Sequence, residues 1–180
     1  MDCVISLDDL NDPFRGKMDL VIAGCKGKGI VMHPYCVLRD VWEQARLWRQ
    51  SRSWFEIKKA IMDLRSGGAH WIAEVLEGVG PQYGRWATNA LPGESWHQYG
   101  AAVDCFVLED KRAVWDSSHR GYAVYASEAM KLDLGVGYYW RYPDPVHVQQ
   151  FRHSVTSSTD WPTINDMMYK RWGLLAKKNE

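Results

Sequence analysis

The residues of this chain best suited to metal chemistry are an aspartate and two histidines in apolar surroundings. Asp104 stands within "AAVDCFVL", with apolar residues on both sides of it. On a strand, Asp104 would share a face with Ala102 and Phe106. An ionised carboxylate buried there is costly unless a cation or several hydrogen-bond donors meet it. A buried arginine or backbone N–H groups would be the ordinary partners.

The two histidines favour a metal ion as the partner of Asp104. His97 comes shortly before Asp104, and His147 lies in "YPDPVHVQQF" between Val146 and Val148. Imidazole and carboxylate groups together suit zinc. Two histidines and one aspartate would supply three protein ligands and leave a position for water, which is typical of catalytic rather than structural zinc sites.

A hydrolytic site of this kind also needs a base, and Asp144 is the candidate. It precedes His147 in a D-x-x-H turn, between Pro143 and Pro145, which restrict the backbone. Such a turn can place one side chain on a metal and the other beside its water. Taken singly, these residues have ordinary structural roles, so the hypothesis of a metal hydrolase depends on their joint pattern.

The composition is that of an ordinary globular domain. The chain has 180 residues, of which 46% are hydrophobic and 24% charged, and Lys+Arg (22) balance Asp+Glu (22). A neutral chain is not expected to bind nucleic acid, and its apolar runs are too short to span a membrane. The N-terminus lacks a basic segment, so synthesis in the cytoplasm without a signal peptide is expected. The four cysteines have no CxxC spacing and are expected to be thiols, with a disulfide left open.

Local patterns predict a mixture of helices and strands. Strands are expected at 30–38, 100–108 and 145–151, and helices at 13–26, 39–50, 53–65, 70–78, 121–133 and within 158–178. Ser6 and Ser53 are expected to be N-caps, and lysines are expected at the end of the last helix. Residues 79–95 are polar and rich in Gly and Pro, which predicts a long loop. Because no βαβ rhythm appears, the fold class is predicted to be α+β with a small antiparallel sheet.

Two motifs give the chain a family resemblance. "SWHQYGAAVD" matches S-x-H-x-x-G-x-A-x-D, and "DPVH" matches a later D/E-x-x-H. Together they resemble the zinc D-alanyl-D-alanine carboxypeptidases and dipeptidases of VanY/VanX type, a family that includes the L-alanyl-D-glutamate endopeptidases of phage endolysins and wall hydrolases. "LRDVWEQARLWRQSRS" and "GVGYYWRYPDPVH" resemble further segments, so the resemblance spans roughly residues 30–151. It implies a Hedgehog/D-Ala-D-Ala peptidase-like fold, with helices flanking the small antiparallel sheet.

The resemblance also implies roles for individual residues. One zinc ion would be held by His97, Asp104 and His147. Asp144 would be the general base, and Arg39 would steady the substrate or the developing oxyanion. Three further positions match residues expected to bind substrate: Ser95, Gln44 and Trp140.

The departures from the family pattern shape the expected function. Ser51 replaces a glycine, Val148 replaces an aromatic residue, and a helical insertion is expected at about 53–80. An aspartate at Asp144, rather than a glutamate, is more similar to the endopeptidase branch. The resemblance therefore implies a single zinc peptidase domain over 1–180, a monomer. It would cleave peptidoglycan stem peptides as an endolysin-type L-alanyl-D-glutamate endopeptidase, acting on the wall after release or export.

Three alternatives remain open from the sequence. The first is a D,D-carboxypeptidase that removes terminal D-Ala. The second is a non-catalytic, zinc-stabilised wall-binding domain. The third is a metal-free domain in which Asp104 pairs with an arginine such as Arg39 or Arg85. Product analysis separates the two enzymes, and chelator-insensitive melting would favour the third alternative.

Overall fold

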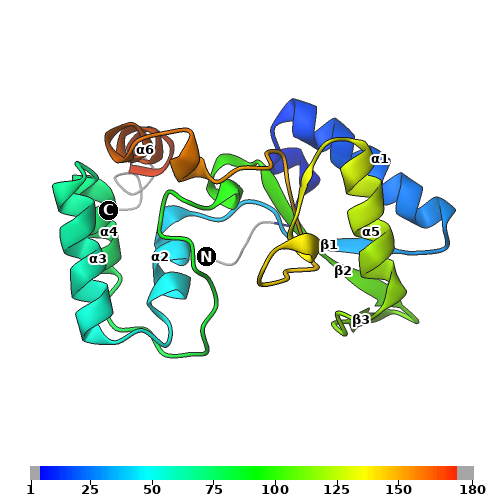
Figure 1. Cartoon of the computed structure of the whole chain (residues 1–180), viewed down its shortest axis with the longest axis horizontal. Helices are drawn as coiled ribbons and strands as arrows, with labels where there is room; N and C mark the ends of the chain where they lie inside the picture. Colours follow the sequence, from blue (N-terminus) through cyan, green and yellow to red (C-terminus); the bar gives the residue numbers. More distant parts are fainter. Residues whose placement is uncertain (1–4, 174–180) are drawn as a thin grey trace. The chain divides into compact units, whose positions relative to one another are not determined.

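The computed structural model describes residues 5–173, which fall into two compact units (Figure 1). We call the first the sheet unit: it contains the described residues up to Leu38 together with Tyr99–His153. We call the second the helical unit: it contains Arg39–Gln98 and the described residues from Ser154 onward. Each unit is described by itself.

The sheet unit is built on a small antiparallel sheet with the strand order β1-β2-β5-β4, and β3 also pairs with β2. The strands are β1 (Met32–Cys36), β2 (Ala102–Glu109), β3 (Arg112–Val114), β4 (Gly135–Val136) and β5 (His147–Gln149). The predicted α+β class with a small antiparallel sheet is therefore confirmed.

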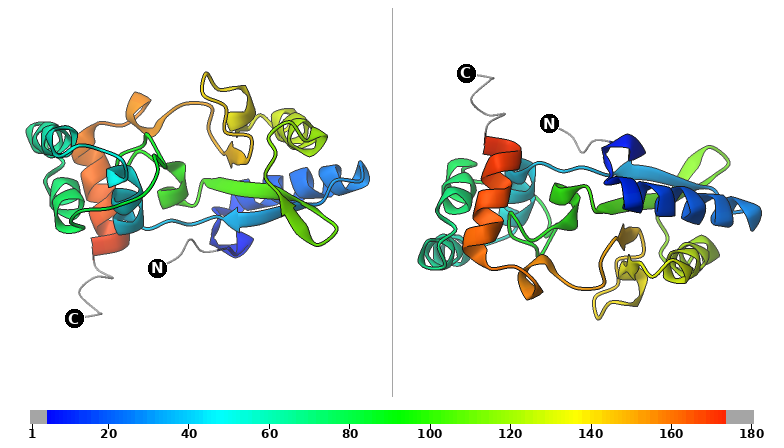
Figure 2. Two further views of the ribbon diagram at one scale, coloured as in Figure 1. Left: turned by 90° about the horizontal axis from the view of Figure 1, so that it is seen from below. Right: turned by 90° about the horizontal axis from the view of Figure 1, so that it is seen from above.

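Two helices, α1 (Asp12–Gly27) and α5 (Arg120–Lys131), pack against the strands of this unit (Figures 1 and 2). Three alternate residues of β2, Val103, Cys105 and Val107, join the apolar side chains of both helices in one core. Because side chains alternate along a strand, Asp104 and Phe106 face the other side of the sheet. The core that both helices form with the sheet therefore lies on the face opposite the one that carries Asp104.

A β-bulge in β1 changes which side chains face Asp104. Pro34 pairs with Cys105 and Cys36 pairs with Asp104, so Tyr35 is the extra residue between them. A bulge of this kind redirects the side chains beside it. As a result Cys36 lies opposite Asp104, although simple alternation would have placed Cys36 and Pro34 on the same face.

Strands β3 and β4 are absent from the sequence prediction, and their shortness explains why. β2 and β3 are joined by the two residues Asp110 and Lys111, whose φ angles are +48° and +61°. Two left-handed residues are what a tight hairpin turn requires, but such turns are usually recognised by Asn-Gly or Asp-Gly. With neither pair in the sequence, the hairpin gave no recognisable signal.

The helical unit contains α2 (Val41–Arg49), α3 (Trp54–Ser66), α4 (His70–Gly78), α6 (Trp161–Met168) and the π-helical turn η5 (Tyr169–Gly173). Ser53 caps α3 as predicted, in a reciprocal capping box with Glu56. Asp160 caps α6 by accepting from the N–H of Thr163, at 3.0 Å. The lysines expected at the end of the last helix lie outside the described residues.

Four short 3-10 helices complete the described chain. They are η1 (Leu7–Asp9), η2 (Trp96–Tyr99), η3 (Gly137–Tyr139) and η4 (Val155–Ser157). Ser6 caps η1, as the sequence predicted. Residues 79–95 form the expected loop without helix or strand. η2 follows this loop and leads directly into β2.

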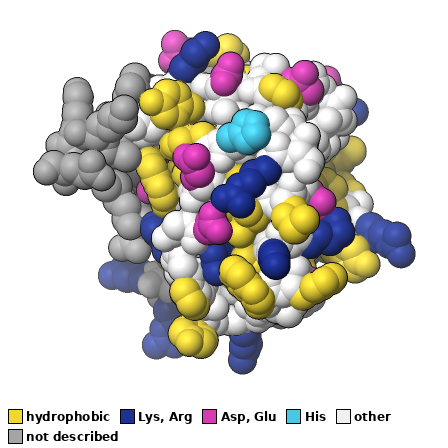
Figure 3. Space-filling view, turned by 90° about the vertical axis from the view of Figure 1, so that its left-hand side faces the viewer, with side chains coloured by type: hydrophobic (Ala, Val, Ile, Leu, Met, Phe, Trp, Pro, Cys, Tyr) yellow, Lys and Arg dark blue, Asp and Glu magenta, His cyan; other side chains and the backbone are white. Residues whose placement is uncertain are grey.

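The outer surface of the helical unit is chemically mixed. On α3, the side chains of Trp54, Phe55 and Met62 are exposed. Figure 3 shows hydrophobic side chains on this side of the molecule interspersed with residues of both charges. None of the described helices combines the length and apolar character needed to cross a membrane.

Candidate metal and catalytic site

The sheet register places three chemically active side chains in a row across neighbouring strands. Asp104 on β2 pairs with Cys36 on β1 and with His147 on β5. Asp104 Oδ1 and His147 Nδ1 are 2.9 Å apart, and only 7% and 8% of the two residues are exposed. The buried carboxylate singled out in the sequence is thus brought directly against one of its two predicted histidine partners.

His97 reaches the same region from η2, the short helix that precedes β2 in the chain. Cys36, His97 and Asp104 each offer one ligand atom, and these atoms all lie within 4.8 Å of one another. All three residues are buried. The described residues therefore contain a group of donors that could hold a metal ion, and it includes two of the predicted ligands.

Cys36 is an unsuitable metal ligand in this structure because it is disulfide-bonded. Metal coordination by cysteine requires the thiolate. The expectation of thiols is therefore wrong for Cys36. Cys25 and Cys105 are free and buried, and burial raises their pKa to about 11 and about 12. These two thiols stay protonated near neutral pH and are inert.

The remaining donors fit one divalent ion. A buried carboxylate beside imidazole nitrogens is the oxygen-and-nitrogen donor set that zinc takes in catalytic sites. His147 is not in the compact donor group, but its contact with Asp104 places it next to that group. On chemistry, His147 is a better third ligand than the disulfide sulfur of Cys36.

The electrostatics of His147 reflect its acidic neighbours. Burial, the largest single influence, lowers the pKa of His147, but the hydrogen bond and charge of Asp104 and the charge of Asp144 outweigh it. The net pKa is raised above 6.5. The charge of Asp144, the predicted base, therefore helps to raise the pKa of His147, the predicted ligand at the other end of the D-x-x-H turn.

Backbone hydrogen bonds hold the D-x-x-H turn in place. The N–H of Asp144 donates to the carbonyl of Gly137 (2.9 Å), and the N–H of His147 donates to the carbonyl of Asp144 (3.1 Å). The carbonyl of Val146 accepts from the N–H of Cys105 on β2, at 2.9 Å. A Cβ added to Gly137 would overlap the Asp144 carbonyl. The turn is therefore fixed at both ends, and one of its contacts requires a glycine.

Trp140 lies at the edge of the site. Its ring centroid is 5.0 Å from that of His147, and 43% of the residue is exposed. Of the three predicted substrate-binding residues, Trp140 is therefore brought into contact with a predicted ligand. A half-exposed indole in this position can contact a bound peptide while it packs on the imidazole.

Arg39, Gln44 and Ser95 belong to the helical unit. Arg39 Nη1 donates to Gln44 Oε1 (3.0 Å), and Gln44 Nε2 donates to the carbonyl of Ala90 (2.7 Å). Gln44 is fully buried, so it links the Arg39 guanidinium to the loop 79–95. The N–H of Arg39 donates to the carbonyl of His97 at 3.4 Å. Ser95 is buried two residues before His97.

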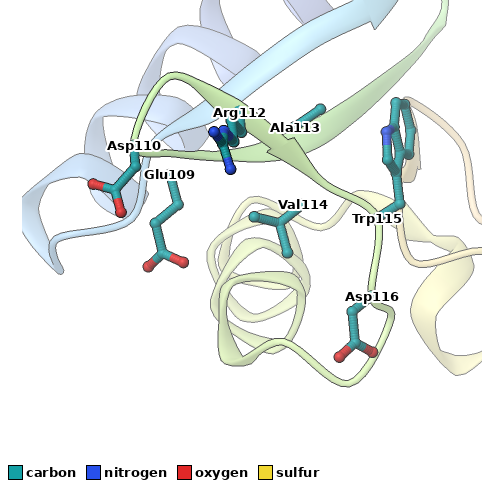
Figure 4. A pocket seen from close by; sticks show the side chains of 7 residues that line it. All are labelled: Glu109, Asp110, Arg112, Ala113, Val114, Trp115 and Asp116. Atoms are coloured by element: carbon teal, nitrogen blue, oxygen red, sulfur yellow. The ribbon is translucent and has the colours of Figure 1, made fainter.

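A surface hollow of about 670 Å³ lies elsewhere in the sheet unit (Figure 4). It runs along the β2–β3 hairpin and is lined by Glu109, Asp110, Arg112, Ala113, Val114, Trp115 and Asp116. Figure 4 shows Asp110 and Asp116 at opposite ends of it. None of the predicted site residues lines this hollow, so it is separate from the candidate site.

Sequence reasoning missed Gln149, which touches the site directly. Gln149 Oε1 lies 3.1 Å from His147 Nε2, so both ring nitrogens of His147 have polar neighbours. The available signal was the spacing, since residues two apart on a strand share a face. The proximity of Cys36 had no such signal, because it depends on the bulge in β1.

Comparisons with known proteins identify the family. No curated protein matches the chain. A family model described as VanY, D-alanyl-D-alanine carboxypeptidase, matches residues 9–153. This match covers most of the 180 residues and includes Asp104, both histidines and the D-x-x-H turn. The chain therefore belongs to the VanY D-alanyl-D-alanine carboxypeptidase family of peptidases.

Proposed function

We propose that this protein is a zinc-dependent peptidoglycan peptidase that cleaves the stem peptide between L-Ala and D-Glu, as endolysin peptidases do. The observation that supports metal dependence is the contact of 2.9 Å between the buried residues Asp104 and His147. The ligand atom of His97 lies within 4.8 Å of that of Asp104. Family membership supports the peptidase activity itself.

Three side chains would hold the ion: His97, Asp104 and His147. When bound, zinc would supply Lewis acidity, which lowers the pKa of water and polarises a peptide carbonyl. The buried surroundings of these residues exclude bulk water and so strengthen such electrostatic effects. Trp140, packed on His147 at 5.0 Å, would contact the substrate at the rim of the site.

Asp144 would transfer the proton of the attacking water. Its backbone is held by Gly137, and its charge acts on His147, so its carboxylate belongs to the same local environment as the ligands. As general base it would take a proton from the attacking water, and as general acid it would return that proton to the leaving amine. Arg39, held by Gln44 at 3.0 Å, would stabilise the negative charge that develops on the carbonyl oxygen.

The preference for the L-Ala–D-Glu bond rests on the residue at the base position. Asp144 is an aspartate, and the endopeptidase branch of the family resembles this chain in that respect. The substrate would be the stem peptide of peptidoglycan, and the biological setting we propose is that of an endolysin.

A D,D-carboxypeptidase is the second candidate, and the description of the matching family model favours it. The two candidates share the metal site and the base. They differ only in which part of the stem peptide the protein holds across the site, so substrate cleavage decides between them.

The deciding experiment is digestion of purified peptidoglycan with mass analysis of the products. An endopeptidase leaves L-Ala on the glycan and frees peptides that begin with D-Glu, whereas a carboxypeptidase releases single D-Ala residues. His97→Ala, prepared in parallel, should release neither product. Release of D-Ala alone would replace the endopeptidase proposal with the second candidate. No cleavage by the zinc-loaded wild-type protein would contradict both candidates and favour a wall-binding role.

A further inference from the structure

We propose that Gln149 is a positioning residue of the metal site. In this proposal its amide oxygen accepts the Nε2 hydrogen of His147 and so makes Nδ1 the nitrogen that a metal ion would bind. The inference rests on the metal-dependent function proposed above, and it concerns a residue that neither motif of the family pattern contains.

The position of Gln149 on the sheet gives its side chain access to His147. The two residues are the ends of β5 and share one face of it, and Gln149 is buried, with 7% of the residue exposed. Its neighbours across the sheet are Ala102 on β2 and Gly135 on β4. Because both neighbours are small, the amide of Gln149 has room to lie back along its own strand.

The orientation of the Gln149 amide is determined by two backbone carbonyls. Its Nε2 donates to the carbonyl of Phe151 at 2.5 Å and to the carbonyl of His153 at 3.4 Å. The reverse orientation would place Oε1 against two acceptors and lose both hydrogen bonds. Oε1 is therefore the atom directed at His147 Nε2, at 3.1 Å.

This orientation decides which ring hydrogen stays when a metal binds. An amide oxygen accepts hydrogen bonds and cannot donate one, so the contact of 3.1 Å requires a hydrogen on His147 Nε2. Asp104 Oδ1 is also an acceptor and lies 2.9 Å from Nδ1, so without a metal Nδ1 donates its own hydrogen to that carboxylate. A metal ion would replace this Nδ1 hydrogen, because a metal-bound imidazole nitrogen is deprotonated, while Gln149 keeps the hydrogen on Nε2.

The first test measures zinc affinity by competition with a chromophoric chelator. Gln149→Leu removes the acceptor and should weaken zinc binding on the order of 10- to 100-fold, the usual effect of losing a partner of a metal-bound histidine. Gln150→Leu makes the same change at the next residue, off the shared face, and should bind zinc as the wild type does. Equal affinities for Gln149→Leu and Gln150→Leu would overturn the proposal.

The second test reads the imidazole directly by ¹⁵N NMR on the metal-free protein. In the wild type the Nε2 hydrogen of His147 should exchange slowly with water because Gln149 accepts it, whereas in Gln149→Leu it should exchange on the order of 10-fold faster or more. Gln149→Met, which is close in size and lacks the acceptor, should show the same faster exchange and provides a second variant if Gln149→Leu fails to fold. A bare Nε2 in the wild type would contradict the proposal.

These readouts separate failure of this inference from failure of the proposed function. A wild-type protein that binds no zinc would remove the proposed function, while the NMR measurement would still decide the role of Gln149. A zinc-binding protein without peptidase activity would likewise leave the affinity comparison valid.

Discussion

A carboxylate buried in an apolar strand is the residue on which the proposed chemistry depends. Asp104 is 7% exposed, and the register sets it between Cys36 and His147. Burial of an ionised acid is tolerated when positive charge or hydrogen-bond donors compensate for lost hydration. In this protein the compensating groups could also be metal donors, so one arrangement would satisfy the buried charge and form the proposed metal site.

Replacing Asp144 with Asn should separate catalysis from metal binding. The amide cannot act as a base, so peptidoglycan cleavage should fall on the order of 10²- to 10⁴-fold. Metal analysis should still find about one zinc per chain, because Asp144 is not among the proposed ligands. Asp133→Asn, at an exposed aspartate of the same unit, is the matched control and should leave cleavage unchanged. Unaltered cleavage by Asp144→Asn would remove this residue from the role of base.

Glu94 should make the stability of the protein depend on pH. Burial raises its pKa above 4.5, and the N–H of Leu91 lowers it by less. Because the pKa of the folded state exceeds that of the unfolded state, the stabilisation is present below the unfolded pKa and is lost as pH rises through the folded one. Glu94→Gln can keep the acceptor for Leu91 without the charge.

The free energy of unfolding of Glu94→Gln relative to wild type should therefore increase between about pH 4 and pH 7. Urea denaturation at a series of pH values measures this difference. A difference that stays constant over that range would show that Glu94 ionises equally well in the folded and unfolded protein.

At the scale of elements, the sheet and one turn bring the distant parts of the site together. Antiparallel pairing of β5 with β2 sets His147 opposite Asp104, and the turn before β5 carries Asp144. The turn closes on η3 through Gly137, where no Cβ can be accommodated. A displacement of this turn would therefore move Asp144, the proposed base, while the ladder between β2 and β5 persists.

Gly137→Ala should lower activity far more than it lowers stability. The added Cβ would displace the Asp144 carbonyl, and a shift of about 1 Å can cost about a hundredfold in rate. Steady-state cleavage of a stem peptide and urea unfolding measure the two effects. Gly16→Ala in α1 is the matched control, since its Cβ meets nothing within 4 Å. It should add about 0.5–1 kcal/mol of stability and leave cleavage unchanged. Full activity in Gly137→Ala would show that the turn can adapt.

At the scale of the whole molecule, the sequence predicted what depends on local pattern. The cap at Ser53, the helix after it and the alternation around Asp104 are local, and the structure has all of them. The neighbour Cys36 could not be predicted, because strand pairing and the bulge are set by contacts between distant segments. The position of Gln149 did have a signal, since it lies two residues from His147 on the same strand. The disulfide at Cys36 was left open for the same reason.

Metal removal should destabilise the whole protein. An ion that binds only the folded state adds stability that grows with its concentration relative to the dissociation constant. Dialysis against a chelator should therefore lower the melting temperature by several degrees, and added zinc should restore it. His97→Ala should melt at the lower temperature with or without the chelator. Identical melting of the wild-type protein in both conditions would support the metal-free alternative.

The extra residue in β1 shows how this strand can tolerate a change of length beside the buried Asp104. Pairing is regular on either side of Tyr35, with Pro34 against Cys105 and Cys36 against Asp104. Deleting Tyr35 would let the ladder run continuously with both partnerships intact. The ring that touches Phe106 and Trp115 would be lost with it. Homologous chains one residue shorter at this point can therefore keep the same partners across the sheet.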